Sequence, residues 1–135
     1  MSAKVVVVGS LNMDLVTRAS RLPHGGETLI GQSFATVCGG KGANQAVAAA
    51  RLGAQVSMVG CVGSDAYGQV LRQALLDEGI DCRAVSAVEG TSGVALIVVD
   101  DNSQNAIVIV AGANGALTPA AVSYTHLTLP TNREV

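Results

Sequence analysis

Two patterns of apolar and polar residues alternate along most of the chain. Continuous apolar runs, typical of buried parallel strands, occupy Lys4 to Gly9 and Gln55 to Val62, and Cys82 to Val88 is a further strand candidate. Helices are predicted for Ala43 to Leu52, which is rich in alanine, and for residues 67–75, where apolar residues recur at the spacing of one helix face. Strands that alternate with helices predict an α/β fold built on a parallel sheet.

A second group of segments alternates more loosely between apolar and polar residues, which suggests exposed or half-buried strands. They are Leu15 to Arg21, Thr28 to Cys38, Gly93 to Val99 and Ala106 to Val110. Turn residues separate the members of each pair, and Asp100 and Asp101 are expected at a solvated hairpin tip. The predicted fold class is therefore α/β, with a partial parallel sheet, flanking helices and a small antiparallel flap.

Composition and charge exclude several classes of function. The formal net charge is −2, and the 8 lysines and arginines are spread along the chain, so no basic face for nucleic acid is expected. No apolar stretch is long enough to cross a membrane. The three cysteines are odd in number and widely spaced, which argues against a disulfide framework or a zinc site and favours reduced thiols in a cytoplasmic protein.

The C-terminal end of the sequence contains a conflict between local signals. Thr118-Pro119 is a strong helix start, with threonine as the N-cap and proline at the first helical position. From about Val122, however, threonines and a proline replace any apolar stripe. We interpret residues 122–135 as a non-native tail, similar to a translated sequencing adaptor, and residues 1–121 as the N-terminal part of a larger domain.

The glycine-rich segment Gly39 to Ala46 is the first candidate site. It lies between a strand and a helix N-terminus, where unpaired backbone N–H groups and the helix dipole can face a polar ligand. Lys41 adds donors and Asn44 adds donors and acceptors, a combination suited to sugar hydroxyls. Nucleotide motifs do not match, because Gly42 follows the lysine and Gln45 stands where a dinucleotide fingerprint needs glycine. Spacing alone leaves open a tight strand-to-helix connection without a ligand.

Asn12 and Asp14 form the second candidate site, just after the first predicted strand. Ligands bind open α/β sheets at the carboxyl ends of their strands. The two residues alternate, so both side chains can project to one side if the chain stays extended there. A carboxylate and an amide together can bind two neighbouring hydroxyls, although a polar turn after a strand would show the same residues.

Together these segments resemble the ribokinase branch of the ribokinase/PfkB family of carbohydrate kinases. The first signature of that family is matched by Gly39, Gly40, Gly42, Asn44, Ala46, Gly53 and Gly63. Further motifs, between Lys4 and about Ala121, are Pro23 to Thr28, Gly60 to Asp65, Thr91 to Ala95 and Ala111 to Asn114. The resemblance implies a sugar site made by Asn12, Asp14, Gly40, Lys41, Gly42 and Asn44. It also implies a β-sheet lid, formed by residues 15–38 and 93–110, over that site.

The resemblance further implies ATP-dependent phosphorylation of D-ribose to D-ribose 5-phosphate. Such an enzyme is expected to be cytoplasmic, to use ATP, Mg²⁺ and a monovalent cation such as K⁺, and to form a homodimer through the lid. The catalytic base of the family lies in a Gly-Ala-Gly-Asp motif that this sequence does not contain. We therefore expect this chain to carry the sugar-binding half, without catalytic, nucleotide-binding or metal-binding residues. The alternatives are another sugar or nucleoside kinase of the family, or an inactive fragment that binds or dimerises through its lid.

Overall fold

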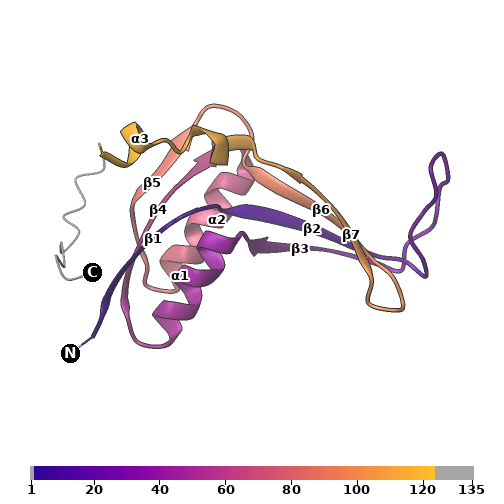
Figure 1. Ribbon diagram of the computed structural model, residues 1–135, viewed down its shortest axis with the longest axis horizontal. Coiled ribbons are helices and arrows are strands. Elements are labelled where there is room, and N and C mark those ends of the chain that lie inside the picture. The colour runs from indigo at the N-terminus through magenta and orange to yellow at the C-terminus, as the bar shows by residue number, and fades with distance from the viewer. Residues whose placement is uncertain (1, 124–135) are drawn as a thin grey trace.

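Strands and helices follow one another along the chain much as the hydrophobic pattern predicted. A computed structural model of the protein describes residues 2–123. Its elements are β1 (Lys4–Val8), β2 (Asn12–Arg18), β3 (Ser33–Gly39), α1 (Lys41–Arg51), β4 (Gln55–Gly63), α2 (Ala66–Asp77), β5 (Asp81–Val88), β6 (Gly93–Val99), β7 (Asn105–Val110), a 3-10 helix η1 (Gly112–Ala116) and α3 (Pro119–Ser123). The strands form two sheets, sheet A beside the helices and sheet B extending away from them (Figure 1).

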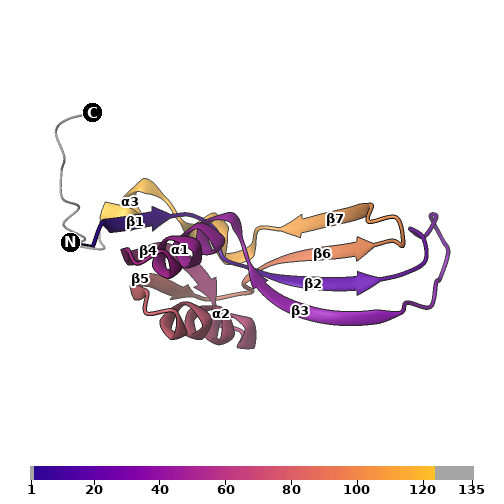
Figure 2. The same cartoon turned by 90° about the horizontal axis from the view of Figure 1, so that it is seen from below.

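Sheet A contains the strands in the order β1-β4-β5, and all of them are parallel. Helix α1 packs against β1 and β4, and helix α2 packs against β4 and β5. Crossovers between parallel strands are right-handed, and both crossovers here advance in the same direction through the sheet. The two helices consequently lie on the same face of sheet A (Figures 1 and 2). The predicted α/β class is confirmed.

Strand β4 is the centre of the core, because it has a strand on each side and helices packed on it. From Val56 to Gly63 every residue except Ser57 is buried. Met58 is fully buried and belongs to the same apolar cluster as Leu71 of α2 and Leu11 of the β1–β2 connection. A nearly continuous apolar run is the sequence pattern of such a strand, which is why the sequence alone identified it.

Sheet B has the strand order β3-β2-β6-β7 and projects beyond the helices (Figure 2). Its outer pairs, β2 with β3 and β6 with β7, are antiparallel, but the central pair, β2 with β6, is parallel. The predicted antiparallel flap is thus a mixed sheet. The reason lies in sheet A: β2 follows β1 and β6 follows β5, so both leave the carboxyl edge of a parallel sheet in the same direction.

The turn between β6 and β7 differs from the prediction at one residue. Asp101 is exposed, as expected, but Asp100 is buried, with 7% of its surface accessible. The Asp100 Oδ1 accepts hydrogen bonds from the backbone N–H groups of Asn102 at 2.8 Å and Gln104 at 2.9 Å. An aspartate that closes a turn on its own backbone loses contact with solvent. The expectation of a solvated tip was therefore wrong for Asp100.

A hydrogen-bond network joins the start of α2 to the connection between β5 and β6. Asp65 is the N-cap of α2 and accepts a hydrogen bond from the Gly68 N–H at 3.0 Å. The Asp65 carboxylate also accepts from the Ser92 backbone N–H at 2.9 Å and from the Ser92 hydroxyl at 2.7 Å. The Ser92 hydroxyl oxygen in turn accepts from the Gly63 N–H at 2.9 Å. These bonds hold the chain that enters sheet B against the carboxyl edge of sheet A.

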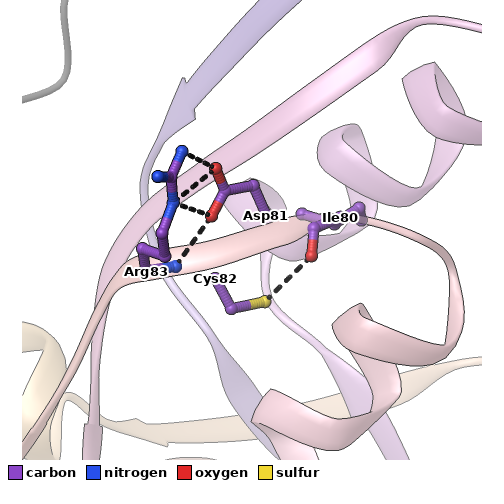
Figure 3. A network of polar contacts seen from close by, with 4 residues as sticks. All are labelled: Ile80, Asp81, Cys82 and Arg83. Carbon is purple, nitrogen blue, oxygen red and sulfur yellow. Dashed lines mark hydrogen bonds and ion pairs between the residues drawn. The ribbon is translucent and has the colours of Figure 1, made fainter.

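Strand β5 begins with a local polar contact beside a buried thiol (Figure 3). The Arg83 guanidinium lies 2.6 Å from the Asp81 carboxylate and lowers the pKa of that carboxyl. Cys82, the residue between them in sequence, is buried, and its thiol points away from this pair and donates to the Ile80 carbonyl oxygen at 3.5 Å. Burial raises the pKa of Cys82, so the thiol stays protonated and serves as a core residue. All three cysteines of the sequence are free.

The C-terminal end of the described chain contains the helix start that the sequence predicted. Thr118-Pro119 begins helix α3. Neither this helix nor any other within residues 2–123 is long and apolar enough to cross a membrane. The predicted non-native tail lies almost wholly outside the described residues, since residues 124–135 are not among them. The division of the chain at residue 121 therefore stays a prediction.

Candidate functional site

Two connections meet at the carboxyl edge of sheet A, one between β1 and β2 and the other between β3 and α1. The Ala43 N–H donates to the Ser10 carbonyl oxygen at 3.0 Å across this contact. A Cβ on Gly42 would lie 2.7 Å from the carbonyl carbon of Gly9, and a Cβ on Gly40 would lie 2.6 Å from the Ser10 carbonyl oxygen. Gly40 also has a φ of 98°. Both glycines are therefore required for the two connections to touch.

A cavity of about 450 Å³ lies between these connections and sheet B. This volume is within the usual range for small-molecule sites. Five predicted site residues line the cavity: Asn12, Asp14, Gly40, Lys41 and Asn44. The sixth, Gly42, does not line it, because Gly42 faces the β1–β2 connection. Residues that are far apart in the sequence thus form one candidate site.

Asp14 supplies the carboxylate of the cavity. It is partly buried, and burial raises its pKa above the ordinary aspartate value of 3.8. A Cβ on Gly39 would lie 2.5 Å from Asp14 Oδ2, so the glycine on the neighbouring strand leaves space for the carboxylate. Within residues 2–123, no group donates a hydrogen bond to the Asp14 carboxylate. Its acceptor positions can therefore receive hydroxyl groups of a ligand.

Helix α1 directs its N-terminus at the cavity. Gly40 is its N-cap and provides no side-chain hydrogen bond to the first turn. The Ala43 N–H is bonded to Ser10, but the helix dipole at this end favours a polar or anionic ligand. Lys41 and Asn44 lie in the first turn, are exposed, and line the cavity. Together they place a cation and an amide in the same cavity as the carboxylate of Asp14.

The opposite wall of the cavity is aliphatic. It is formed by Ala95 and Ile97 of β6 and by Ile107 and Ile109 of β7. Residues two apart on a strand point to the same face, so these side chains extend one apolar surface of sheet B over the polar residues. A ligand held here meets hydrogen-bonding groups on one side and hydrocarbon on the other, which suits a sugar with polar edges and C–H faces.

Asn12 faces the cavity from β2, and Asn114 of η1 holds its amide. The Asn114 Nδ2 donates to the Asn12 Oδ1 at 2.8 Å. The same Asn114 side chain bonds both backbone polar groups of Leu11, at 3.0 Å each. Two positions that are 102 residues apart in the sequence are thereby joined in the site.

A second hollow lies at the other end of α1, with a volume of about 590 Å³. Its lining residues are Ser2, Ala3, Ala49, Leu52, Gly53 and Ala54. None of them carries an ionisable side chain, and five have no polar side-chain atom. It therefore offers little that could orient or transform a ligand, and the cavity at the carboxyl edge of sheet A is the candidate site.

The fold and this cavity define an α/β protein with a cavity of the size of a small-molecule site between a parallel sheet and a projecting mixed sheet. Residues 2–133 match the sequence model of the pfkB family of carbohydrate kinases. The chain belongs to this family.

Individual relatives show how much of a family member the chain represents. A ribokinase of Bacillus subtilis is 52% identical over 117 residues, which cover 86% of this chain and 40% of that protein. A deoxyribokinase of Salmonella typhi is 46% identical over 116 residues, covering 85% of this chain and 38% of that one. The solved structure of Arabidopsis thaliana ribokinase complexed with ribose and ATP has a TM-score of 0.75 and 40% identity, and the match covers 84% of this chain and 38% of that chain. The chain spans about two fifths of the length of these relatives.

Sequence reasoning missed part of the site. Ser10, Asn114 and the aliphatic wall from sheet B line the cavity but were not predicted as site residues. Asn114 did belong to a motif that matched the family, yet no spacing rule connects it with a residue near the other end of the chain. The wall residues belong to segment 93–110, which the resemblance assigned to a lid over the site, but which of its side chains face the cavity depends on how sheet B lies over the carboxyl edge of sheet A.

Proposed function

We propose that this chain is the sugar-binding part of a longer ribokinase, which transfers a phosphate group from ATP to D-ribose and forms D-ribose 5-phosphate. The observation that carries the proposal is the meeting of Asn12, Asp14, Lys41 and Asn44 in one cavity of suitable size. Family membership and the ribokinase relatives support the same class of reaction.

The proposed roles of the residues follow from their hydrogen-bonding capacity. The Asp14 carboxylate accepts hydrogen bonds from sugar hydroxyls, while Lys41 donates and Asn12 and Asn44 offer an amide each. Hydrogen bonds to charged groups are the stronger ones, so Asp14 and Lys41 contribute most to affinity. Gly40 and Gly42 act through the backbone, because they allow the two loops of the site to approach each other.

Sheet B is proposed to act as the lid of the site. Its β6 and β7 place Ile97 and Ile109 over the polar residues of the cavity. Covering a bound sugar excludes water, so that in the longer enzyme the phosphate group is transferred to the sugar and not to solvent. The segments assigned to the lid are residues 15–38 and 93–110.

The nucleotide and cations of the reaction are not assigned to residues of this chain. ATP is proposed as the phosphate donor, in line with the Arabidopsis ribokinase that is complexed with ribose and ATP. Residues 2–123 contain no group of three or more histidine, cysteine, aspartate or glutamate side chains that could hold a metal ion. We propose that Mg²⁺, K⁺ and the catalytic base are held by the remainder of the longer enzyme.

Two further proposals concern assembly and location. Sheet B exposes large apolar side chains, among them Phe34, Leu96 and Val108, and this supports a homodimer that forms through the lid. The three cysteines are free, and because disulfides are rare in reducing compartments, this supports a cytoplasmic location.

The test of the proposed function is a calorimetric titration of D-ribose into the purified chain, with fructose 6-phosphate and adenosine as controls. We expect D-ribose alone to bind, and Asp14→Asn to weaken its affinity at least tenfold, because a charged acceptor is lost. We also expect no phosphorylation of ribose when ATP and Mg²⁺ are added. Absence of ribose binding by a folded chain would contradict the sugar site, and robust phosphorylation would contradict the assignment of catalysis to the longer enzyme.

A deoxyribokinase is the second candidate. The Salmonella typhi deoxyribokinase is nearly as similar to this chain as the ribokinases are. The two sugars differ in one hydroxyl, and a site that hydrogen-bonds that hydroxyl rejects the analogue without it. A parallel titration of 2-deoxy-D-ribose separates the two: tighter binding of D-ribose supports ribokinase, and tighter binding of the deoxy sugar supports deoxyribokinase.

A further inference from the structure

The Asn114 side chain makes three hydrogen bonds at the sugar site, and their polarity is determined by the backbone. The Leu11 N–H donates to Asn114 Oδ1 at 3.0 Å, and Asn114 Nδ2 donates to the Leu11 carbonyl oxygen at 3.0 Å. A peptide N–H only donates and a carbonyl only accepts, so a reversed Asn114 amide would place like groups against each other twice. The orientation of Asn114 therefore follows from the direction of the chain at Leu11.

The orientation of Asn114 in turn determines that of Asn12. The second hydrogen of Asn114 Nδ2 points at Asn12 and is accepted by Asn12 Oδ1 at 2.8 Å. If the Asn12 amide were reversed, two NH₂ groups would face each other and the bond would be lost. Asn12 is consequently held with its oxygen toward Asn114, and its own Nδ2 donors remain for the cavity that Asn12 lines.

The start of β6 closes the space around this pair. Asn12 and Gly93 are directly opposite each other in the β2–β6 ladder. A Cβ on Gly93 would overlap both Asn114 Nδ2 and Asn12 Oδ1. The glycine thus leaves room for the two amides to meet and nothing larger.

We propose that Asn114 is a positioning residue, which sets the amide of Asn12 so that it donates to the ligand while Asp14 accepts from it. The proposal rests on the sugar-binding function proposed above. Asn12 and Asp14 are two residues apart on β2, and both line the cavity. The strand therefore presents a donor at Asn12 and an acceptor at Asp14 to the same ligand. A ligand that fits has one hydroxyl that accepts a hydrogen bond near one that donates, which is the pattern of a polyol with neighbouring hydroxyls.

A double-mutant cycle on ribose affinity tests whether Asn114 acts through Asn12. The chain is compared with Asn12→Ala, Asn114→Ala and the double variant, by calorimetric titration of D-ribose. We expect each single substitution to weaken binding about tenfold, and the double variant to bind about as weakly as Asn12→Ala. Additive losses, or unchanged affinity in Asn114→Ala, would overturn the proposal, because a purely structural role of Asn114 does not depend on the side chain at Asn12.

A second variant with a side chain of the same shape keeps the proposal testable if Asn114→Ala does not fold. Asn114→Asp keeps the shape of the side chain but has only acceptors where Nδ2 stood. It loses the bond to the Leu11 carbonyl oxygen, as Asn114→Ala does, and in addition the Asn12 amide should reverse and turn its oxygen to the cavity beside Asp14. We expect ribose affinity to fall at least tenfold while the circular dichroism spectrum is retained. Asn105→Asp, the same change at an exposed residue outside the cavity, should leave the affinity unchanged. Equal affinity of Asn114→Asp and Asn105→Asp for ribose would count against the proposal.

A measurement without ligand separates this inference from the proposed function. In nuclear magnetic resonance spectra of the chain, the Asn114 side-chain NH₂ and the Leu11 amide should exchange slowly with solvent, and the Asn12 NH₂ should exchange fast. If D-ribose does not bind the chain, the sugar site is wrong, yet this exchange pattern still decides whether Asn114 orients Asn12. Slow exchange at Asn12 together with fast exchange at Asn114 would refute the proposed orientation.

Discussion

At the scale of single residues, the site combines a carboxylate that is costly to bury with glycines that cannot carry a side chain. The pKa of Asp14 is raised by burial, which means that the folded protein disfavours the ionised form. Hydroxyl donors of a ligand favour that same ionised form. Asp14 therefore lowers the stability of the unliganded protein at neutral pH and contributes affinity once a sugar is bound.

The first prediction concerns the pH dependence of ribose binding. A protonated Asp14 is a weaker acceptor, so affinity should fall as the pH falls through its pKa, which lies above 3.8. The contribution of Asp14 to the free energy of unfolding has the opposite sign and should rise as the pH falls through the same pKa, because the folded state binds the proton more tightly. Calorimetric titrations at a series of pH values check the first effect. Asp14→Asn should bind weakly without this acid dependence; the same dependence in that variant would assign it to another group.

The second prediction concerns the contact between the two loops. Gly42→Ala should destabilise the protein by about 1–3 kcal/mol, because its Cβ would lie 2.7 Å from the backbone of Gly9 and of Ser10. The matched control is Gly115→Ala, whose Cβ would meet nothing within 4 Å, and it should change the free energy of unfolding by less than about 0.5 kcal/mol. Urea unfolding measures both. Equal stability of the two variants would show that the loops do not touch as described.

At the scale of elements, the network around Asp65 joins helix α2 to the chain that enters sheet B. Ser92 is almost fully buried, with 1% of its surface accessible. Its hydroxyl oxygen accepts from the Gly63 N–H at the end of β4, and the hydroxyl donates to Asp65, the N-cap of α2. Burial raises the pKa of Asp65, but hydrogen bonds from Ser92 and Gly68 lower it overall, so the carboxylate stays ionised as a cap.

The third prediction follows from this network. Ser92→Ala should lower the free energy of unfolding by about 1–3 kcal/mol, because the buried Gly63 N–H loses its acceptor and the Asp65 cap loses a donor. Ser33→Ala, at the exposed first residue of β3, is the control and should have little effect. Chemical unfolding monitored by circular dichroism compares the two. A Ser92→Ala variant as stable as the control would mean that water or another group replaces the hydroxyl.

At the scale of the whole molecule, sheet B projects from the rest of the protein with apolar side chains in solvent. Phe34 is 65% exposed and Val108 is 61% exposed. Both lie on the face opposite to the one that lines the cavity, as the register of the strands requires. An exposed group of large apolar residues on a projecting sheet is typical of an interface, which agrees with the proposed homodimer.

The fourth prediction concerns self-association through this surface. Val108→Asp should shift the chain toward the monomer, because a charge at an apolar interface must be desolvated. Val70→Asp, the same change at an exposed position of α2, should associate like the unmodified chain. Size-exclusion chromatography with light scattering over a range of concentrations measures the mass. A chain that is monomeric throughout, or a Val70→Asp variant that dissociates equally, would contradict a dimer through sheet B.

The local elements could be predicted from the sequence with few errors, and the errors have physical causes. The buried run of β4, the Asp65 cap and the hairpin between β6 and β7 all follow from interactions between residues that are near in sequence. Asp100 was misplaced because a side chain that bonds its own turn looks, in sequence, like one that faces water. The parallel pairing of β2 with β6 was missed because the relative direction of these strands depends on tertiary structure: both follow strands of sheet A that end at the same edge.

The sequence by itself determined the class of fold, the two glycine-containing loops and the residue types of a sugar site. Periodicity, turn chemistry and the family resemblance carry that information locally. Only the tertiary structure decided that Asn12 and Asp14 share a cavity with Lys41 and Asn44, that Gly42 supports the site without lining it, and that Asn114 meets Asn12. Such contacts arise when the carboxyl ends of β1 and β5 and the N-terminus of α1 converge at one edge of sheet A, and no spacing along the chain encodes that convergence.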